Sequence, residues 1–282
     1  MTEKCIIIGA SHAAAQLCVS LRQGGWDGSI TVIGDEDDMP YHRPPLSKDF
    51  LSGDKTLSDI LIRPAEIYEK ANIDLKLGVR VVAINREEKS VLTDDGDVYP
   101  YDKLVLTTGA RVRNLPVPGE DLKGVYYLRD TKDVLEIKSQ VALGKRAVII
   151  GGGYIGLETG ASLKKQGMEV TILEAMPRIL KRVTAPELSR FYKRVHQEEG
   201  INILEGVVAS EILKSNDRLT VSTSCQQNFD ADLVIIGIGV IPNMELAEMS
   251  GLTVGNGIEV NAFCQTSDSD IYAAGDVTWH FN

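Results

Sequence analysis

VIIGGGYIGLETGASL, residues 148–163, carries the strongest structural signal in the chain. An apolar run typical of a buried strand meets three consecutive glycines, and a run with helical spacing follows. Gly151, Gly153 and Gly156 have the GxGxxG spacing. In that pattern the first glycine makes a tight turn, the second lets the backbone approach a pyrophosphate, and the third lets helix and strand pack closely. The segment therefore predicts a strand–turn–helix unit that binds a dinucleotide.

The acid that follows this unit predicts which dinucleotide is bound. Glu174 ends the next apolar stretch, 18 residues after Gly156. A carboxylate there accepts hydrogen bonds from both hydroxyls of an adenosine ribose, whereas a 2′-phosphate would meet a like charge. At about 4 Å and an effective dielectric constant near 20, that repulsion is on the order of 4 kcal/mol. The sequence therefore favours NADH over NADPH, although the nearby Arg178 would weaken the preference.

A less regular copy of the unit lies near the start of the chain. CIIIGASHAAAQLCVSLRQGG, residues 5–25, combines an apolar strand, a tight turn and an amphipathic helix. Gly9 opens the turn, whereas Ser11 and an alanine replace the second and third glycines and are small enough to keep the approach close. The next strand ends in Asp35 and Glu36, and either acid would serve as the ribose acceptor. We therefore expect a second dinucleotide site here.

Two strand–helix–strand units require parallel sheets, and alternating strand-rich segments follow each unit. We therefore predict an α/β fold of two doubly wound, Rossmann-like dinucleotide-binding domains with inserted β-rich segments. The first domain is expected to be discontinuous and incomplete, with residues 1–114 and 245–282, and the second to span 115–244. MPYHRPPLSKDFLSGDK, residues 39–55, is too long and too rich in proline and charge for a simple connector, so we expect it to be functional.

The composition argues against several classes of protein. A net charge of −10 without a long basic block disfavours nucleic-acid binding. No apolar run approaches the roughly 20 residues that span a bilayer, and no signal-like segment precedes the first strand, so we expect no membrane contact and a cytoplasmic location. The four cysteines contain no CxxC pair, so neither a metal site nor a CxxC redox disulfide is predicted.

Several further segments point to one family. RPPLSK, GGGYIGLE, YDKLVLTTGAR, DLVIIGIGVIPNMELAEMSGL and TSDSDIYAAGD occur in that family's motifs, and nearly the whole chain follows its order. Together they resemble the FAD-dependent, NADH-linked ferredoxin reductases of bacterial oxygenase systems, the putidaredoxin-reductase and biphenyl-dioxygenase-reductase type. Members of this family continue for roughly another hundred residues, about one small domain, beyond AAGD. We therefore expect a reductase truncated at its C-terminus.

The resemblance implies that the first unit binds FAD and the second binds NADH. The expected FAD set is Gly9, Ser11, His12, Ala13, Asp35, Arg43, Lys48, Val82, Thr108, Gly109, Arg129 and Asp276, with His12 as a turn residue rather than a base. The expected NADH set is Gly151, Gly153, Tyr154, Ile155, Gly156, Glu174 and Gly239.

The resemblance also implies the reacting residues. Lys48 is expected to approach the N5 and O4 edge of the flavin from the other domain, and Glu158 to lie near the nicotinamide and the flavin. We expect the two to form an ion pair that positions the rings and balances charge as hydride arrives. A merely capping or solvated role for Glu158 is the alternative.

The implied reaction takes hydride from NADH onto N5 of FAD and then passes single electrons to a [2Fe–2S] ferredoxin that feeds an oxygenase. Because no CxxC pair is present, the electrons are expected to leave the flavin directly. Two other hypotheses stay open: an NADH-responsive flavin-binding module resembling apoptosis-inducing factor, and a truncated fragment without turnover.

Overall fold

The computed structural model describes residues 3–216 and 218–280, which form two compact units. Unit 1 contains the chain up to His42, Ser58–Arg111, and the chain from Ile241 onward. Unit 2 contains Arg43–Leu57 and Val112–Val240. The chain therefore passes between the units four times.

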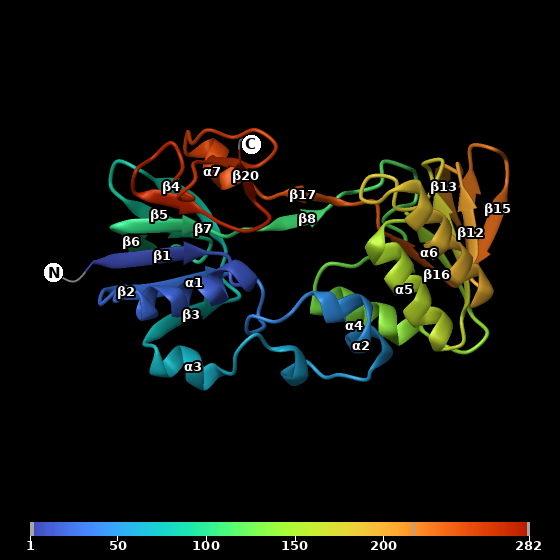
Figure 1. Ribbon diagram of the computed structural model, residues 1–282, viewed down its shortest axis with the longest axis horizontal. Helices are drawn as coiled ribbons and strands as arrows, with labels where there is room; N and C mark the ends of the chain where they lie inside the picture. The colour runs from blue at the N-terminus through green and yellow to red at the C-terminus, as the bar shows by residue number, and fades with distance from the viewer. Residues whose placement is uncertain (1–2, 217, 281–282) are drawn as a thin grey trace. The chain divides into compact units, whose positions relative to one another are not determined.

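Unit 1 is built on a five-stranded parallel sheet in the order β19-β7-β1-β2-β3 (Figure 1). Its strands are β1 (Lys4–Ile8), β2 (Ser29–Gly34), β3 (Ile73–Leu77), β7 (Lys103–Leu106) and β19 (Ile271–Ala273). Around it lie β4 (Val81–Asn85), β5 (Ser90–Thr93), β6 (Val98–Pro100), β18 (Ile258–Val260), β20 (Thr278–His280), η2 (Ser58–Ile60), α3 (Ala65–Lys70) and α7 (Glu245–Met249).

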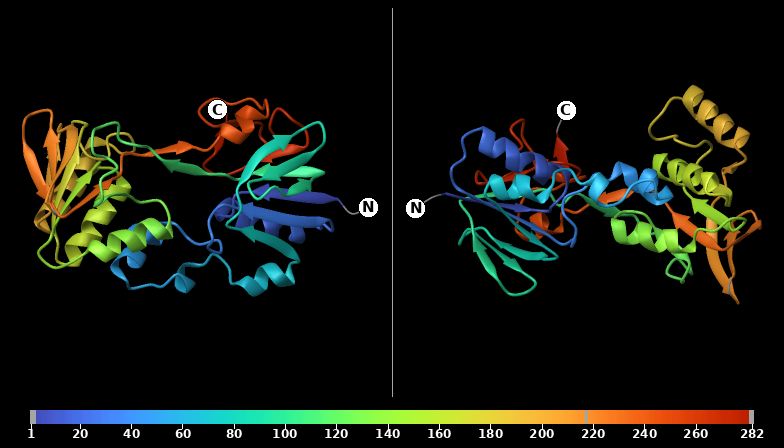
Figure 2. Two further views of the ribbon diagram at one scale, coloured as in Figure 1. Left: turned by 180° about the vertical axis from the view of Figure 1, so that it is seen from behind. Right: turned by 90° about the horizontal axis from the view of Figure 1, so that it is seen from below.

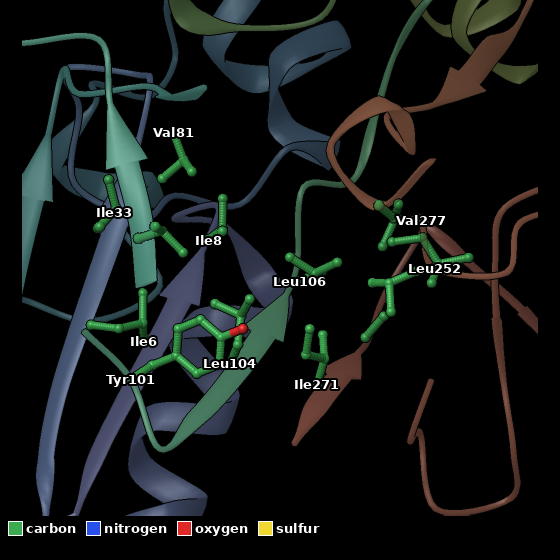
Figure 3. Close-up of a cluster of buried hydrophobic side chains, with 14 of the residues drawn as sticks. Ile6, Ile8, Ile33, Val81, Tyr101, Leu104, Leu106, Leu252, Ile271 and Val277 are labelled. Carbon is green, nitrogen blue, oxygen red and sulfur yellow. The ribbon is translucent and has the colours of Figure 1, made fainter. Parts of the chain in front are cut away.

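The alternation of side chains along β1 explains how this sheet is covered on both faces. Cys5 and Ile7 pack on helix α1 (His12–Gln23), whereas Ile6 and Ile8 point the other way. The second group joins a core that includes side chains from the antiparallel strands β4 and β5 (Figure 3). Every other residue of a strand faces one side, so a continuously apolar strand is expected when both faces are buried.

Unit 2 repeats this design with a parallel sheet in the order β12-β11-β10-β16-β9. Its strands are β9 (Val125–Tyr127), β10 (Arg146–Ile150), β11 (Glu169–Glu174), β12 (Asn202–Glu205) and β16 (Leu233–Ile236). Helices α5 (Tyr154–Lys165) and α6 (Pro186–Glu198) lie on one face, and α4 (Thr131–Gln140) packs beside β9. The antiparallel strands β13 (Ala209–Ser215), β14 (Arg218–Thr223) and β15 (Asn228–Ala231) cover the other face (Figure 2). The predicted α/β class with two doubly wound domains is confirmed.

The proline-rich segment departs from the predicted division of the chain. We expected residues 43–57 to belong to the first domain, but they pack within unit 2. Their helical turns η1 (Pro44–Ser47) and α2 (Asp49–Ser52) lie against α4 and α5, where Leu46, Phe50 and Leu51 are buried. Burial of these three apolar side chains explains the placement. The assignment of FAD to one domain and NADH to the other stays a prediction.

Two further short strands, β8 (Ala110–Val112) and β17 (Val240–Pro242), pair with each other where the chain passes between the units. No helix among residues 3–216 and 218–280 is both long enough and apolar enough to cross a membrane.

The three glycines of the GxGxxG pattern have different structural environments. A Cβ on Gly156 would lie 2.0 Å from the Gly151 carbonyl oxygen, and one on Gly151, whose φ is +117°, would lie 2.3 Å from the Gly237 carbonyl oxygen. A Cβ on Gly153 would meet no atom within 4 Å. Two of the three glycines are therefore demanded by packing, and the middle one faces open space.

This difference predicts unequal effects of two alanine substitutions on stability. We expect Gly156→Ala to lower the free energy of unfolding by about 2 kcal/mol or more, because backbone must move to admit the methyl group. Gly153→Ala should change it by less than about 1 kcal/mol, since only the N-cap preference is lost. Guanidinium chloride unfolding of the three proteins without nucleotide measures both values. A Gly156→Ala protein as stable as the parent would contradict the packing argument.

Candidate functional site

The carboxyl ends of the parallel strands in unit 2 bring several predicted residues to one edge of the sheet. Ile150 pairs in register with Leu173 on one side and with Ile236 on the other. The next residues, Gly151, Glu174 and Gly237, therefore emerge together, which is where open α/β sheets bind ligands. The predicted Gly239 follows at φ +114°, and a Cβ there would also meet no atom within 4 Å.

Helix α5 begins at this edge with features that fit a diphosphate. Gly153 is its N-cap residue and has no side chain to satisfy the first backbone N–H groups. The predicted Tyr154 and Ile155 form the first turn and are 46% and 43% exposed. Free N–H groups at a helix N-terminus, next to a glycine that faces open space, favour an anion. The residues present therefore fit the pyrophosphate of a dinucleotide.

Glu174 is held firmly at the same edge. Its Oε2 accepts a hydrogen bond from the Gly152 N–H at 2.7 Å, and its Oε1 accepts one from the Met176 N–H at 2.6 Å. Each carboxylate oxygen has a second lone pair, so ribose hydroxyls can still donate to it. The carboxylate is therefore preoriented beside the glycine turn.

Arg178, expected to weaken the preference for NADH, is engaged elsewhere in unit 2. Its Nη1 donates to Ser189 Oγ of α6 at 2.5 Å, and its Nη2 donates to the Lys181 carbonyl oxygen at 3.2 Å. These bonds hold the guanidinium against α6. The position of this positive charge is therefore set by two neutral acceptors.

Unit 1 forms a similar edge. Ile8 is in register with Ile33 and Leu106, and Leu106 with Ala273. Because all these strands are parallel, the predicted residues that follow them gather at the same edge. These are Gly9, Ser11, His12 and Ala13 after β1, Asp35 after β2, Thr108 and Gly109 after β7, and Asp276 after β19.

Close backbone approaches again fix the turn after β1. Gly9 has φ +101°, and a Cβ on it would lie 2.3 Å from the Thr107 carbonyl oxygen. The buried Thr107 hydroxyl lies 3.0 Å from the Ile8 carbonyl oxygen and 2.9 Å from that of Gly9, so its single hydrogen is shared between the two acceptors. Gly275 has φ +88°, and its Cβ would touch Ala13. Thr107 is thus a structural residue of the site that the motif analysis missed, since a threonine before TGA has no distinctive pattern.

The acids after β2 already have side-chain partners. Asp35 forms an ion pair with Arg80 at 2.9 Å, and both side chains are more than half exposed. Glu36 accepts a hydrogen bond from the Tyr41 hydroxyl. Val82 comes two residues after Arg80, the partner of Asp35, and lies on β4 at a β-bulge between Val81 and Ala83. A bulge redirects a side chain and is common near binding sites.

His12 is the first residue of α1 and lies close to a second histidine. Its Nε2 is 3.3 Å from Nδ1 of His42, and the ring centroids are 5.3 Å apart. The two nitrogens share one hydrogen bond whose donor depends on the tautomers. His12 is thus a helix residue directly after the glycine turn, and the prediction that it is not a base stays a prediction.

Three residues of the predicted FAD set lie in unit 2. Arg43 donates through Nη1 to the Arg129 carbonyl oxygen at 2.8 Å, and the Arg129 N–H donates to Asp133 Oδ2 at 2.7 Å. Burial raises the pKa of the Asp133 carboxyl. The backbone of Arg129 is therefore fixed on both sides at the end of β9. Lys48 is the third of these residues.

Lys48 and Glu158 form the expected ion pair, with Nζ 2.6 Å from Oε2. The expectation that they approach from different domains is wrong, because residues 43–57 carry Lys48 into unit 2. The Ser47 hydroxyl donates to the same Glu158 oxygen, also at 2.6 Å. Ser47 was missed by the sequence analysis, since nothing in the letters LSK distinguishes a buried serine from an exposed one.

Both units have a glycine turn after one parallel strand and an acid after the next, an arrangement typical of dinucleotide-binding domains. The model of the family described as pyridine nucleotide-disulphide oxidoreductase matches residues 3–281, so the chain belongs to this family.

Putidaredoxin reductase of Pseudomonas putida is 42% identical over 280 residues, which cover 97% of this chain and 66% of that protein. The ferredoxin–NAD(+) reductase component of the anthranilate 1,2-dioxygenase system of Burkholderia cepacia is 39% identical over 277 residues, 98% of this chain and 68% of that protein. The solved covalent putidaredoxin reductase–putidaredoxin complex matches with a TM-score of 0.96 at 41% identity, covering 99% of this chain and 69% of that chain. The predicted resemblance is confirmed, and the chain spans about two thirds of these relatives' length.

The cysteines matter in a family whose description includes disulphides. All four are free: Cys5 and Cys18 are buried, Cys264 is partly buried and Cys225 is exposed. Burial raises the pKa of Cys5 to about 11 and that of Cys18 to about 12. A hydrogen bond with the Thr223 hydroxyl lowers the pKa of Cys225. No group of three His, Cys, Asp or Glu residues within 3–216 and 218–280 is arranged to hold a metal ion.

The thiols should therefore react in a definite order. With iodoacetamide at pH 8 we expect Cys225 to be alkylated first, because it is exposed and its thiolate is favoured. Cys5 and Cys18 are buried and burial raises the pKa of both thiols, so they should react only after unfolding. Mass spectrometry of timed digests measures the order. Cys225→Ser should remove the fast phase, and alkylation of native Cys5 at the rate of Cys225 would contradict the assignment.

Proposed function

We propose that the chain is an NADH-dependent flavoprotein reductase, in which unit 1 holds FAD, unit 2 holds NADH, and a [2Fe–2S] ferredoxin of an oxygenase system receives the electrons. The observation that carries this proposal is the pair of sheet edges described above. Each combines a glycine turn, the start of a helix and a following acid. When bound, NADH supplies a hydride, and FAD accepts it and releases electrons singly.

The partner follows from the relatives. Proteins 39% and 42% identical to this chain carry the names of ferredoxin and putidaredoxin reductases. A covalent complex with putidaredoxin has been solved for a homologous reductase. The four cysteines of this chain are free, so a route through a cysteine pair finds no support. We also propose a cytoplasmic location, where a reducing environment keeps such thiols free.

In unit 2, the chain's own groups bind and orient the pyridine nucleotide. The first N–H groups of α5, with Gly151 and Gly153, would hold the pyrophosphate, and Glu174 would accept the ribose hydroxyls. Gly239 leaves room at the neighbouring turn.

In unit 1, Gly9, Ser11 and Ala13 would hold the FAD pyrophosphate at the start of α1. Asp35 would accept the ribose hydroxyls, in exchange for its exposed pair with Arg80. The remaining proposed contacts are His12, Val82, Thr108, Gly109 and Asp276 of unit 1, and Arg43, Lys48 and Arg129, which belong to unit 2.

For the reaction itself we assign Lys48 and Glu158 to contact with the reacting rings. Their ion pair, with 44% and 30% of the side chains exposed, keeps opposite charges together at one place on unit 2. An anion held beside a compensating cation orients a polar ring system without the need for reorganisation during reaction.

Reconstitution with FAD tests the function directly. The chain with FAD should show a protein-bound flavin band that NADH bleaches anaerobically, and oxidised [2Fe–2S] ferredoxin should then restore the band. Gly153→Val should keep FAD but lose bleaching, because its side chain would fill the open space at the start of α5. A retained flavin that NADH does not reduce would overturn the proposal. A change of oligomeric state on NADH binding without turnover would support the flavin-module hypothesis instead.

Selection between NADH and NADPH tests Glu174. We expect NADH to be preferred strongly in the parent and Glu174→Gln to reduce that preference by about tenfold or more, because the repulsion of a 2′-phosphate is lost. Arg178→Ala should leave the preference unchanged, since that guanidinium is bound to Ser189 and the Lys181 carbonyl. The ratio of rate constants for flavin reduction by the two nucleotides measures both effects. An unchanged ratio in Glu174→Gln would remove Glu174 from selection.

A further inference from the structure

Ser47, which precedes Lys48 in the chain, makes two hydrogen bonds to helix α5. Ser47 is only 1% exposed. Its hydroxyl donates to Glu158 Oε2 at 2.6 Å, and its carbonyl oxygen accepts from Ser162 Oγ at 2.7 Å. Glu158 and Ser162 are four residues apart, so they lie on the same side of α5. Ser47 is thus held between two polar side chains of one helix face.

The Glu158 carboxylate is bound asymmetrically. Oε2 receives both the Ser47 hydroxyl and the Lys48 ammonium group, each at 2.6 Å. Oε1 receives no hydrogen bond from any residue within 3–216 and 218–280. One oxygen is therefore anchored, and the other is left to interact with a ligand or with water.

Lys48 is poorly suited to fix the direction of this carboxylate by itself. Its side chain is 44% exposed, and its Nζ also donates to the Pro44 carbonyl oxygen at 3.2 Å. An ammonium group on a flexible four-carbon stem attracts a carboxylate without a strong directional preference. Ser47, by contrast, has one short rotor on a buried backbone within the helical turn η1.

We propose that Ser47 is a positioning residue that fixes the Glu158 carboxylate through Oε2, so that Oε1 is presented in one orientation. In this arrangement Lys48 supplies the compensating charge and Ser47 supplies the direction. The effect on flavin reduction rests on the proposed function, whereas the Ser47–Glu158 hydrogen bond does not.

Matched variants separate positioning from simple docking of the segment. Ser47→Ala removes the hydrogen bond to Glu158, whereas Ser162→Ala removes only the hydrogen bond to the Ser47 carbonyl oxygen. In the chain without nucleotide, the carboxylate stretching band of Glu158 is identified by subtracting the infrared spectrum of Glu158→Gln. We expect Ser47→Ala to shift this band and Ser162→Ala to leave it in place. A band that Ser47→Ala does not move, or that both variants move equally, would overturn the proposal.

The kinetic arm uses the FAD-reconstituted chain. Ser47→Ala should lower the limiting rate of NADH-dependent flavin reduction about tenfold with little change in the apparent Kd for NADH, since misorientation acts on the reacting geometry. Ser162→Ala should match the parent. The double variant Ser47→Ala/Glu158→Gln should be no slower than Glu158→Gln alone, because Ser47 is proposed to act through Glu158. Additive losses would overturn the proposal. A parent chain that NADH does not reduce would refute the proposed function, while the infrared arm would still decide the role of Ser47.

Discussion

The close packing at the centre of unit 2 is possible because Gly156 has no Cβ atom. Helix α5 approaches β10 so closely that a Cβ on Gly156 would lie 2.0 Å from the Gly151 carbonyl oxygen. This contact places the start of the helix beside the end of the strand. The register of the parallel sheet then brings Glu174 and Gly237 to the same row. In unit 1, a Cβ on Gly9 would likewise clash with the Thr107 carbonyl oxygen. At both edges, therefore, two backbone segments pack directly against each other with no side chain between them.

The carboxylates of Glu174 and Glu158 in unit 2 are held by different patterns of hydrogen bonds, and each pattern suits a different role. Both carboxylate oxygens of Glu174 accept hydrogen bonds from backbone N–H groups, which fixes the whole carboxylate beside the glycine turn. Glu158 is held by side chains on one oxygen only. The first arrangement suits recognition of a constant feature of a nucleotide, such as a ribose. The second leaves one oxygen able to respond to a charge that changes during reaction.

Local spacing explains which parts of the structure could be predicted from the sequence. GGGYIG and the acid 18 residues later lie within one supersecondary unit, and their roles follow from strand–turn–helix geometry. The ion pair of Lys48 and Glu158 was expected only because of the family resemblance. The packing of residues 43–57 on α4 and α5 was not foreseen, because the partners lie far along the chain and a Pro-rich segment has no periodicity that points to them. Ser47 and Thr107 were missed for a related reason, since a hydroxyl shows its function only once its acceptor is known.

The excursion of residues 43–57 also determines how this protein can be divided at the level of its gene. Residues 112–240 alone would lack Leu46, Phe50 and Leu51, and the surfaces of α4 and α5 that bury these side chains would be exposed to water. A fragment cut at two points therefore leaves an apolar surface that favours aggregation. Exchange of unit 2 between related members of this family requires two separate stretches of coding sequence to be moved together, and recombination at a single pair of breakpoints would separate them.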